Sequence, residues 1–306
     1  MLRGAFIRLS ESPRAQAFVL RNGLARRAAR RFVAGETLAE AVAATREVNA
    51  AGAHASLNYL GEKTTSRSEA EGAADRYVEI LRAITAERLD CNLSIKLSQL
   101  GLALDGALAE GLVRRIVGAA RGESIFVRID MEESALVEPT LALWRRLWGE
   151  GLTNVGLVIQ SYLYRSPADV ESLVATGVRI RLVKGAYLEP PAVAFPRKAD
   201  VDAAYRALTE VLLRRGTYPA IATHDPQMIA HARAVAERES IGRDRFEFQM
   251  IYGVRRDLQQ ALAREGFAVR VYVPFGEQWY PYFMRRLGER PANVFFVLRS
   301  LAAEWR

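Results

Sequence analysis

The chain has 306 residues, of which 50% are hydrophobic and 25% are charged. This composition is typical of a folded protein with a large core and excludes a disordered or fibrous chain. Lys and Arg number 43 against 35 Asp and Glu. So small a surplus over this length does not indicate a nucleic-acid partner, and we expect none.

The cysteine, histidine and apolar content narrow the class of protein further. Cys91 is the one cysteine and has no partner for an internal disulfide, which suits a reducing compartment. The three histidines, His54, His224 and His231, lack the spacing of a His/Cys zinc site, so we expect no metal. Neither a signal peptide nor an apolar stretch of about twenty residues is present, and we therefore expect a cytoplasmic protein.

The N-terminal region differs from the rest of the chain in its arginine content. We expect residues 1–52 to form a helical arm appended to a catalytic domain over residues 53–306. Within the arm, the segment from Pro13 to Arg31 carries six arginines among Ala, Phe, Val and Leu. Its few large apolar residues favour the solvent-facing side of a packed helix. A basic amphipathic helix on a membrane surface is the alternative.

Short runs rich in Val, Ile, Leu and aromatic residues follow the arm, and stretches with helical spacing separate them. The eight predicted strands are His54–Gly61, Asn92–Ser98, Ser124–Asp130, Val155–Tyr162, Val178–Gly185, Pro219–His224, Arg245–Gly253 and Ala268–Gly276. The clearest helical stretches cover residues 74–88, 135–151, 167–177, 200–216, 225–239 and 255–266. This alternation predicts an α/β fold, either a doubly wound sheet or a (β/α)8 TIM barrel, and the number of strands favours the barrel. No GxGxxG follows the first strand and no GxxxxGK[ST] occurs, so the phosphate-binding turns of the open-sheet nucleotide folds are missing.

Polar residues concentrate where the predicted strands end. In a barrel the site lies at the carboxyl ends of the strands, because that rim carries the βα loops. The residues that fall there are Lys96, Asp130, Gln160, Lys184, Thr223 and His224, with Tyr272 inside the eighth strand. We expect them to form a polar cavity above an apolar core.

Lys96 and Asp130 are expected to pair. Lys96 lies in the apolar run SIKLSQLG, where an ammonium group is costly unless it is paired or faces a solvated pocket. A structural salt bridge would explain the two charges equally well. Their place at a barrel rim adds weight to a functional role.

The segment RIRLVKGAY indicates a ligand-binding strand end. The period of two places Arg181, Val183 and Gly185 on one face of the fifth strand, so that Arg181 would point into the barrel mouth. Gly185 and Ala186 are small enough for a flat ligand or its phosphate to approach the backbone closely.

The sixth strand ends in a further candidate site. Asp225 and Pro226 are favourable at the start of a helix, and such a helix N-terminus would accept a phosphate. His224 is either a hydrogen-bond donor to a ligand or a hydrogen-bonded core residue.

Near the C-terminus, WYPYFMRRLGER places four polar side chains on one helix face. Tyr282, Arg285, Arg286 and Glu289 follow the spacing i, i+3, i+4 and i+7. Two adjacent guanidinium groups would grip one carboxylate from two directions, and Glu289 would hold one of them in place. A solvated arginine pair is the simpler interpretation of these residues taken alone.

Together, IKLSQLG, RIDMEES, VIQSYLYRS, RLVKGAY, ATHD and YxxRRxxE resemble the flavin-dependent proline dehydrogenases in order and spacing. The resemblance runs from about Leu57 to the C-terminus, and the arm resembles that of the monofunctional bacterial enzymes. It implies a distorted (β/α)8 barrel whose last helix lies over the active site. It also implies FAD, held without a Rossmann fold.

The resemblance assigns roles to particular residues. The substrate proline would contact Lys96, Tyr187, Ile251, Tyr272, Tyr282, Arg285, Arg286 and Glu289, with Arg285, Arg286 and Lys96 on its carboxylate. FAD would contact Met131, Gln160, Arg181, Lys184, Gly185, Ala186, Thr223 and His224. Asp130 and Arg181 would be catalytic, Asp130 by orienting Lys96 and Arg181 by stabilising the reduced flavin.

The implied reaction is oxidation of L-proline to 1-pyrroline-5-carboxylate by hydride transfer to flavin. A quinone would accept the electrons, and a separate pyrroline-5-carboxylate dehydrogenase would complete the conversion to glutamate. A quinone acceptor would bring the protein to a membrane surface, where the arginine-rich segment would assist peripheral contact. The alternative is a cofactor-free barrel lyase or aldolase with Lys96 or Lys184 as the Schiff-base nucleophile, which would leave the arginine pair without a purpose.

Overall fold

The computed structural model describes residues 12, 16–17, 21, 30–61 and 63–289, and for residues 285–289 it describes the backbone alone. Most of the predicted arginine-rich helix from Pro13 to Arg31 lies outside these residues. No helix in the described ranges is long and apolar enough to cross a membrane.

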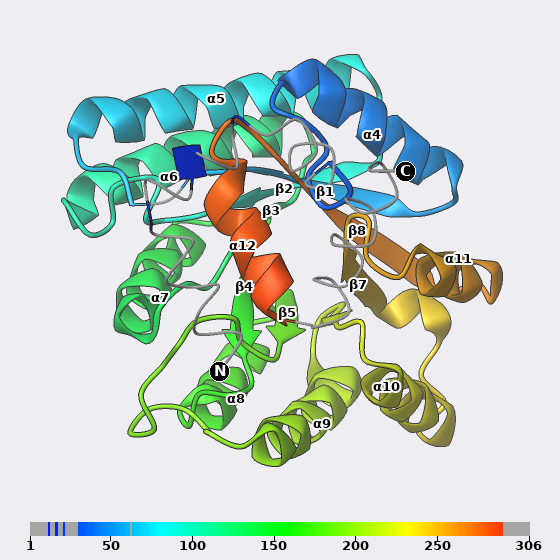
Figure 1. Cartoon of the computed structure of the whole chain (residues 1–306). Helices are drawn as coiled ribbons and strands as arrows, with labels where there is room; N and C mark the ends of the chain where they lie inside the picture. The colour runs from blue at the N-terminus through cyan, green and yellow to red at the C-terminus, as the bar shows by residue number, and fades with distance from the viewer. Residues whose placement is uncertain (1–11, 13–15, 18–20, 22–29, 62, 290–306) are drawn as a thin grey trace.

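A closed parallel barrel forms the centre of the molecule (Figure 1). In the described part of the chain its eight strands pair in sequence order, and the last pairs with the first. They are β1 (His54–Tyr59), β2 (Cys91–Ile95), β3 (Val127–Ile129), β4 (Val155–Gln160), β5 (Ile180–Val183), β6 (Ala220–Ala222), β7 (Glu247–Ile251) and β8 (Ala268–Phe275). Every predicted strand is confirmed, and so is the choice of a barrel over a doubly wound sheet.

Helices surround the barrel and cover its outer face (Figure 1). They are α4 (Leu38–Ala50), α5 (Arg67–Ala86), α6 (Gly106–Gly122), α7 (Ser134–Gly149), α8 (Ser166–Val174), α9 (Lys198–Arg215), α10 (Pro226–Arg238), the short 3-10 helix η1 (Arg243–Arg245) and α11 (Arg256–Arg264). The helix α12 (Trp279–Glu289) does not belong to this outer layer. The six helical stretches predicted from spacing are all present. Capping supports the predicted start of α10, because the Asp225 side chain accepts a hydrogen bond from the backbone N–H of Gln227.

The strands divide their side chains between two environments. Because successive residues point to opposite faces, Leu57, Leu93 and Ile129 lie in the apolar layer between barrel and helices. Alternate positions such as Ser94 and Arg181 point inward, where they contact each other. The expectation of an apolar core beneath the cavity is therefore wrong for the barrel interior. The apolar core lies outside the barrel wall, and buried polar and charged side chains fill much of the inside.

Figure 1 shows α12 lying across the open end of the barrel, as the predicted fold requires. The segment before α4 holds this helix in place. This segment comprises residues 32–36 and is itself anchored on β8, where Ala34 donates its N–H to the carbonyl oxygen of Pro274 at 2.8 Å. Toward the helix, Trp279 Nε1 donates to Glu36 Oε1 at 2.9 Å. A separate apolar cluster joins the segment to the helix, formed by Phe32, Val33, Leu60, Trp279, Tyr280, Tyr282, Phe283 and Met284.

Candidate active site

A cavity of about 590 Å³ opens at the carboxyl ends of the strands and is lined in part by α12 through Tyr282. This volume lies within the range of roughly 300–1,000 Å³ that is typical of small-molecule and cofactor sites. The predicted site residues that line it are Lys96, Asp130, Met131, Gln160, Arg181, Lys184, Gly185, Ala186, Tyr187, Thr223, His224, Ile251, Tyr272 and Tyr282. The barrel thus brings together residues from seven of the eight strand ends and from the last helix.

Asp130 lies at the centre of the charged side chains in the cavity. Its Oδ1 accepts a hydrogen bond from Arg181 Nη1 at 2.7 Å, and its Oδ2 accepts one from the Tyr272 hydroxyl at 2.8 Å. Lys96 Nζ is 3.6 Å from Oδ2, so the predicted pair with Lys96 is present. Arg181 is nevertheless the closer cation and the one with hydrogen-bond geometry.

Tyr272 serves as a neutral donor in this cluster. Burial above all, and then the negative charge of Asp130, raise the pKa of Tyr272 well above its usual range. The hydroxyl therefore keeps its proton and donates a hydrogen bond to the carboxylate. The Arg181 guanidinium carbon lies 5.4 Å from the centre of the Tyr272 ring, a cation–π distance.

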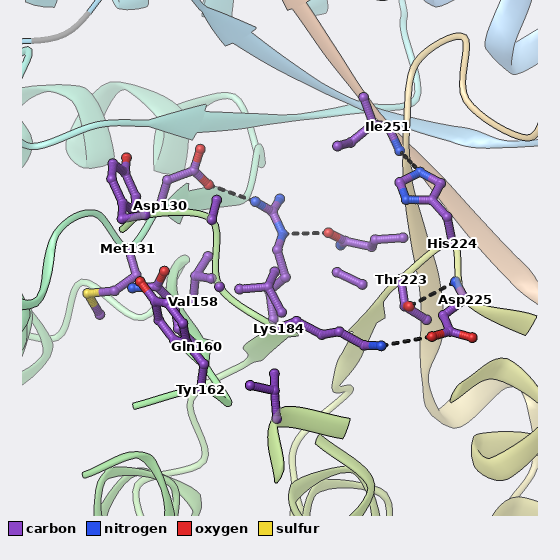
Figure 2. A pocket seen from close by; sticks show the side chains of 18 of the residues that line it. Asp130, Met131, Val158, Gln160, Tyr162, Lys184, Thr223, His224, Asp225 and Ile251 are labelled. Atoms are coloured by element: carbon purple, nitrogen blue, oxygen red, sulfur yellow. Dashed lines mark hydrogen bonds and ion pairs between the residues drawn. The ribbon is translucent and has the colours of Figure 1, made fainter. Parts of the chain in front are cut away.

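Lys184 lines the cavity and lies between two carboxylates, of which Figure 2 shows Asp225. Its Nζ donates to Asp202 Oδ1 at 2.5 Å and to Asp225 Oδ2 at 2.8 Å. Burial alone would raise the pKa of Asp202 and Asp225, but the hydrogen bonds and charge of Lys184 lower both below their ordinary values. The α10 N-terminus, where the sequence suggested a phosphate site, is capped by the Asp225 carboxylate. A phosphate bound there would lie beside this negative charge, which Lys184 balances.

The remaining polar groups on this side are fixed by backbone contacts. His224 Nε2 accepts a hydrogen bond from the Ile251 N–H at 2.8 Å, which places the ring proton on Nδ1 (Figure 2). Gln160 Nε2 donates to the carbonyl oxygen of Glu132 at 2.8 Å. Thr223 Oγ1 accepts from the N–H of Asp225 at 3.1 Å. These contacts hold the three side chains in defined positions on the cavity wall.

Gly185 is required by its backbone conformation and by its neighbour. Its φ is +120°, and a Cβ built there would lie 2.4 Å from the ring of Tyr162. No other residue fits this position without displacing the ring. Gly185 and Ala186 are both among the residues that line the cavity, so the β5–α9 connection borders it at this point.

The predicted arginine pair is placed only in part. Arg285, Arg286 and Glu289 belong to α12, so their helical spacing is confirmed. Their side chains lie outside the described part of the structure. Tyr282, on the same face of the sequence pattern, is buried and lines the cavity.

Several cavity residues were not predicted from the sequence. Gln249 accepts a hydrogen bond from Arg181, and Asp202 from α9 faces Lys184. Gln249 lies on the same strand face as Ile251, so inward alternation along β7 was a signal that could have identified it. Asp202 had no such signal, because it lies inside a helix among other charged residues.

Among the described residues, no group of three or more His, Cys, Asp or Glu side chains is placed to hold a metal ion. A closed barrel with a charged cavity at its carboxyl-end rim, beneath α12, defines an α/β-barrel enzyme. The proline dehydrogenase family model matches residues 41–299 of the chain. The chain therefore belongs to the proline dehydrogenase family, and its enzymatic class is that of an oxidoreductase.

Individual relatives agree with this assignment. The chain is 41% identical to proline dehydrogenase 1 of Bacillus subtilis over 98% of its own length and 99% of that protein. It is 44% identical to the proline dehydrogenase of Deinococcus radiodurans over 89% of each chain. Among solved structures, proline utilization A of Bdellovibrio bacteriovorus, inactivated by N-propargylglycine, superimposes with a TM-score of 0.81. That match has 26% identity and covers 86% of this chain and 32% of the longer protein.

The alternative of a Schiff-base lyase loses its support. The chain belongs to an oxidoreductase family, and both candidate lysines lie beside carboxylates. Each candidate lysine is therefore engaged in an ion pair in this structure.

Proposed function

We propose that this protein oxidises L-proline to 1-pyrroline-5-carboxylate with FAD as its resident cofactor. In the balanced step, the ring C–H bond beside nitrogen breaks, a C=N bond forms, and the substrate loses one hydride and one amine proton. FAD, when bound, supplies the two-electron acceptor for that hydride. The observation that carries the proposal is the buried cluster of Asp130, Arg181 and Tyr272 with Lys96 beneath α12, in a chain of this family.

The donor set of the cavity supports FAD. Gln160, Thr223 and His224 offer hydrogen-bonding groups on the cavity wall, and Gly185 presents no side chain to a flat ligand there. The further contacts that we propose are those with Met131, Lys184 and Ala186. Arg181 would contribute a fixed positive charge beside the ring that becomes electron-rich on reduction.

The substrate would lie between this wall and α12. We propose that Lys96, Arg285 and Arg286 bind the carboxylate of proline, with Glu289 holding one arginine in place. Tyr187, Ile251, Tyr272 and Tyr282 would enclose the ring. Asp130 would keep Lys96 and the Tyr272 hydroxyl in position, which orients the reacting carbon. Support comes from the positions of these side chains on one cavity, as far as they are described.

The route of the electrons and of the product follows from the same proposal. The reduced cofactor would be reoxidised by a quinone, so that a cytoplasmic enzyme would make peripheral contact with a membrane through its arginine-rich N-terminal segment. The product would pass to a separate pyrroline-5-carboxylate dehydrogenase on the way to glutamate.

The visible spectrum of the purified protein tests the proposal. Flavin absorption bands should be present and should bleach on anaerobic addition of L-proline, whereas L-alanine, which lacks the ring amine, should leave them unchanged. If bound flavin does not bleach with proline, the proposed substrate is wrong. If the protein binds no added FAD, the proposed cofactor is wrong.

A further inference from the structure

Deeper in the barrel than the cavity lies a second group of charged side chains. Glu247, the first residue of β7, is only 2% exposed. Its two carboxylate oxygens accept hydrogen bonds from Nε of Arg270 at 3.1 and 3.0 Å. Arg270 is also buried and donates from Nη1 to the carbonyl oxygen of Ala55 at 2.8 Å. Within the described residues, neither member of this pair lines the cavity.

Gln249 connects the pair to the cavity. It lies two residues after Glu247 on the same inward face of β7. Its Nε2 donates to Glu247 Oε1, and its Oε1 accepts from Arg181 Nε at 2.5 Å. An ionised carboxylate only accepts hydrogen bonds, and a guanidinium only donates them. The amide orientation is therefore dictated by its two neighbours, with the NH2 group toward Glu247 and the oxygen toward Arg181.

Glu247 retains the negative charge that this orientation needs. Burial alone would raise the pKa of its carboxyl group, but Arg270 and the hydrogen bond from Gln249 lower that pKa below its ordinary value. The carboxylate is thus ionised at neutral pH and acts as an acceptor toward Gln249.

The contact with Gln249 completes the positioning of Arg181. The guanidinium is held at Nη1 by Asp130 and at Nη2 by the Ser94 hydroxyl at 3.1 Å. With these two contacts alone, the guanidinium could still rotate about the line that joins them. The third contact, from Nε to Gln249, removes this rotation and sets the plane of the guanidinium.

We propose that Glu247, held by Arg270, is a positioning residue that acts through Gln249 to set the plane of the Arg181 guanidinium. The inference rests on the proposed function, in which Arg181 lies beside the flavin. Without Glu247 the NH2 group of Gln249 loses its acceptor, so the amide is no longer anchored on the side away from Arg181 and can shift together with it. The guanidinium would then tilt, and its charge would stabilise the reduced flavin less well.

Two variants separate the parts of this connection. Gln249→Met removes the link and leaves the Glu247–Arg270 pair intact. The double variant Glu247→Met with Arg270→Met removes both charges of the pair together, a replacement that folded proteins often tolerate. Each should slow anaerobic bleaching of the flavin by saturating L-proline about tenfold, because one hydrogen bond to a charged group is lost. The KM for proline should be little changed.

Coupling between the variants is the decisive measurement. Once Gln249→Met has cut the link, adding the double variant should slow flavin bleaching no further, because both changes act on the same contact. The midpoint potential of the bound flavin, measured without proline, should become more negative in each variant. A structural role for the pair predicts instead a lower melting temperature with unchanged bleaching rate and potential, and this result would overturn the proposal. If the double variant does not fold, Gln249→Met alone provides the test. A wild-type rate of flavin bleaching in Gln249→Met would then refute the proposed link between Glu247 and Arg181.

A matched control comes from another buried carboxylate. Asp169 in α8 pairs with Arg165 and is not among the residues that line the cavity, so Asp169→Asn should lower the melting temperature and leave bleaching and potential at wild-type values. Bleaching measured on the wild-type protein distinguishes a failure of the proposed function from a failure of the proposed role of Glu247. If it binds no flavin or ignores proline, the proposed function fails, whereas wild-type bleaching together with unaffected variants refutes only the role of Glu247.

Discussion

At the scale of single residues, Asp130 shows how one carboxylate organises the cavity. It receives hydrogen bonds from a cation and from a neutral hydroxyl, and a second cation lies 3.6 Å away. At 9% exposure it is almost removed from water, so these interactions are screened less than they would be on the surface. The charge of Asp130 is therefore what allows Lys96 and Arg181 to lie in one cavity.

Replacing Asp130 by Asn tests this role. The change keeps the size of the side chain but removes the charge that the two cations share. We expect kcat to fall about 10- to 100-fold while the circular dichroism spectrum stays that of a folded barrel. Insoluble or unfolded protein would instead support a salt bridge that is only structural.

The arginine pair of α12 yields a prediction from the sequence alone. If Arg286 binds the proline carboxylate, Arg286→Met should raise the KM for proline about tenfold or more, because a charged hydrogen bond is lost, while flavin content is unchanged. Arg145→Met, on the exposed face of α7, is the matched control and should leave KM alone. An unchanged KM in Arg286→Met would remove that residue from the substrate site.

At the scale of elements, the segment before α4 and the helix α12 form one unit. Phe32 packs on Phe283 with ring centres 6.2 Å apart, and Trp279 packs on Phe283 at 5.9 Å. Because Tyr282 belongs to the same cluster and lines the cavity, the packing of these residues determines where α12 sits over the site.

Phe32→Ala should loosen this unit. We expect the free energy of unfolding to fall by about 3 kcal/mol and the KM for proline to rise, because α12 is then held less firmly over the cavity. Phe246→Ala is the matched control, since Phe246 is equally buried but packs on Phe248 and Phe267 beneath β7 and β8. It should cost similar stability without raising KM. Equal KM values in the two variants would contradict the role of the segment.

The contact of β4 with β5 leaves no room for a side chain at Gly156. A Cβ at this position would lie 2.4 Å from the carbonyl oxygen of Arg179 and 2.8 Å from Arg128 Nη1. We expect Gly156→Ala to lower the free energy of unfolding by about 1–3 kcal/mol, because either the backbone or the Arg128 side chain must move. Gly118→Ala, in an open position on α6, should stabilise the protein by up to about 1 kcal/mol. Denaturant titration of both variants measures the difference, and a change of the same sign in both would be unexpected.

At the scale of the whole molecule, buried carboxylates link stability to pH. The pKa values of Glu247, Asp202 and Asp225 are lower in the folded protein than their ordinary values of 4.5 for Glu and 3.8 for Asp. As pH falls below about 4.5, the unfolded chain binds protons that the folded protein does not, so acid favours unfolding. The stabilisation is complete above this pH and is lost progressively below it.

We therefore expect the melting temperature to fall steeply between about pH 4.5 and pH 3. These carboxylates contribute no pH dependence between pH 5 and 7. Thermal unfolding followed by circular dichroism across this range measures the effect. The variant that replaces both Glu247 and Arg270 by Met should show a shallower acid fall, since one of the titrating groups is gone. A melting temperature that stays constant down to pH 3 would contradict the pKa shifts.

Much of the architecture follows from local patterns in the chain. The alternation of strand and helix, the closure implied by eight strands, and the polar residues at the strand ends all depend on neighbours in sequence. For the same reason Lys96, Asp130, Arg181 and Tyr272 could be assigned to one cavity before any contact was known. Strand pairing then placed their carboxyl ends on one rim.

Other features depend on which strands and helices contact one another, and only the folded barrel determines those contacts. Contacts between distant segments place Asp130 closer to Arg181 than to Lys96 and bring Asp202 of α9 to face Lys184. They also make the barrel interior charged rather than apolar. The sequence by itself determined the fold class, the family and most residues of the site. Tertiary structure alone decided their partners, because hydrogen bonds and ion pairs depend on distances of a few tenths of an ångström across the barrel, which periodicity along one strand does not contain.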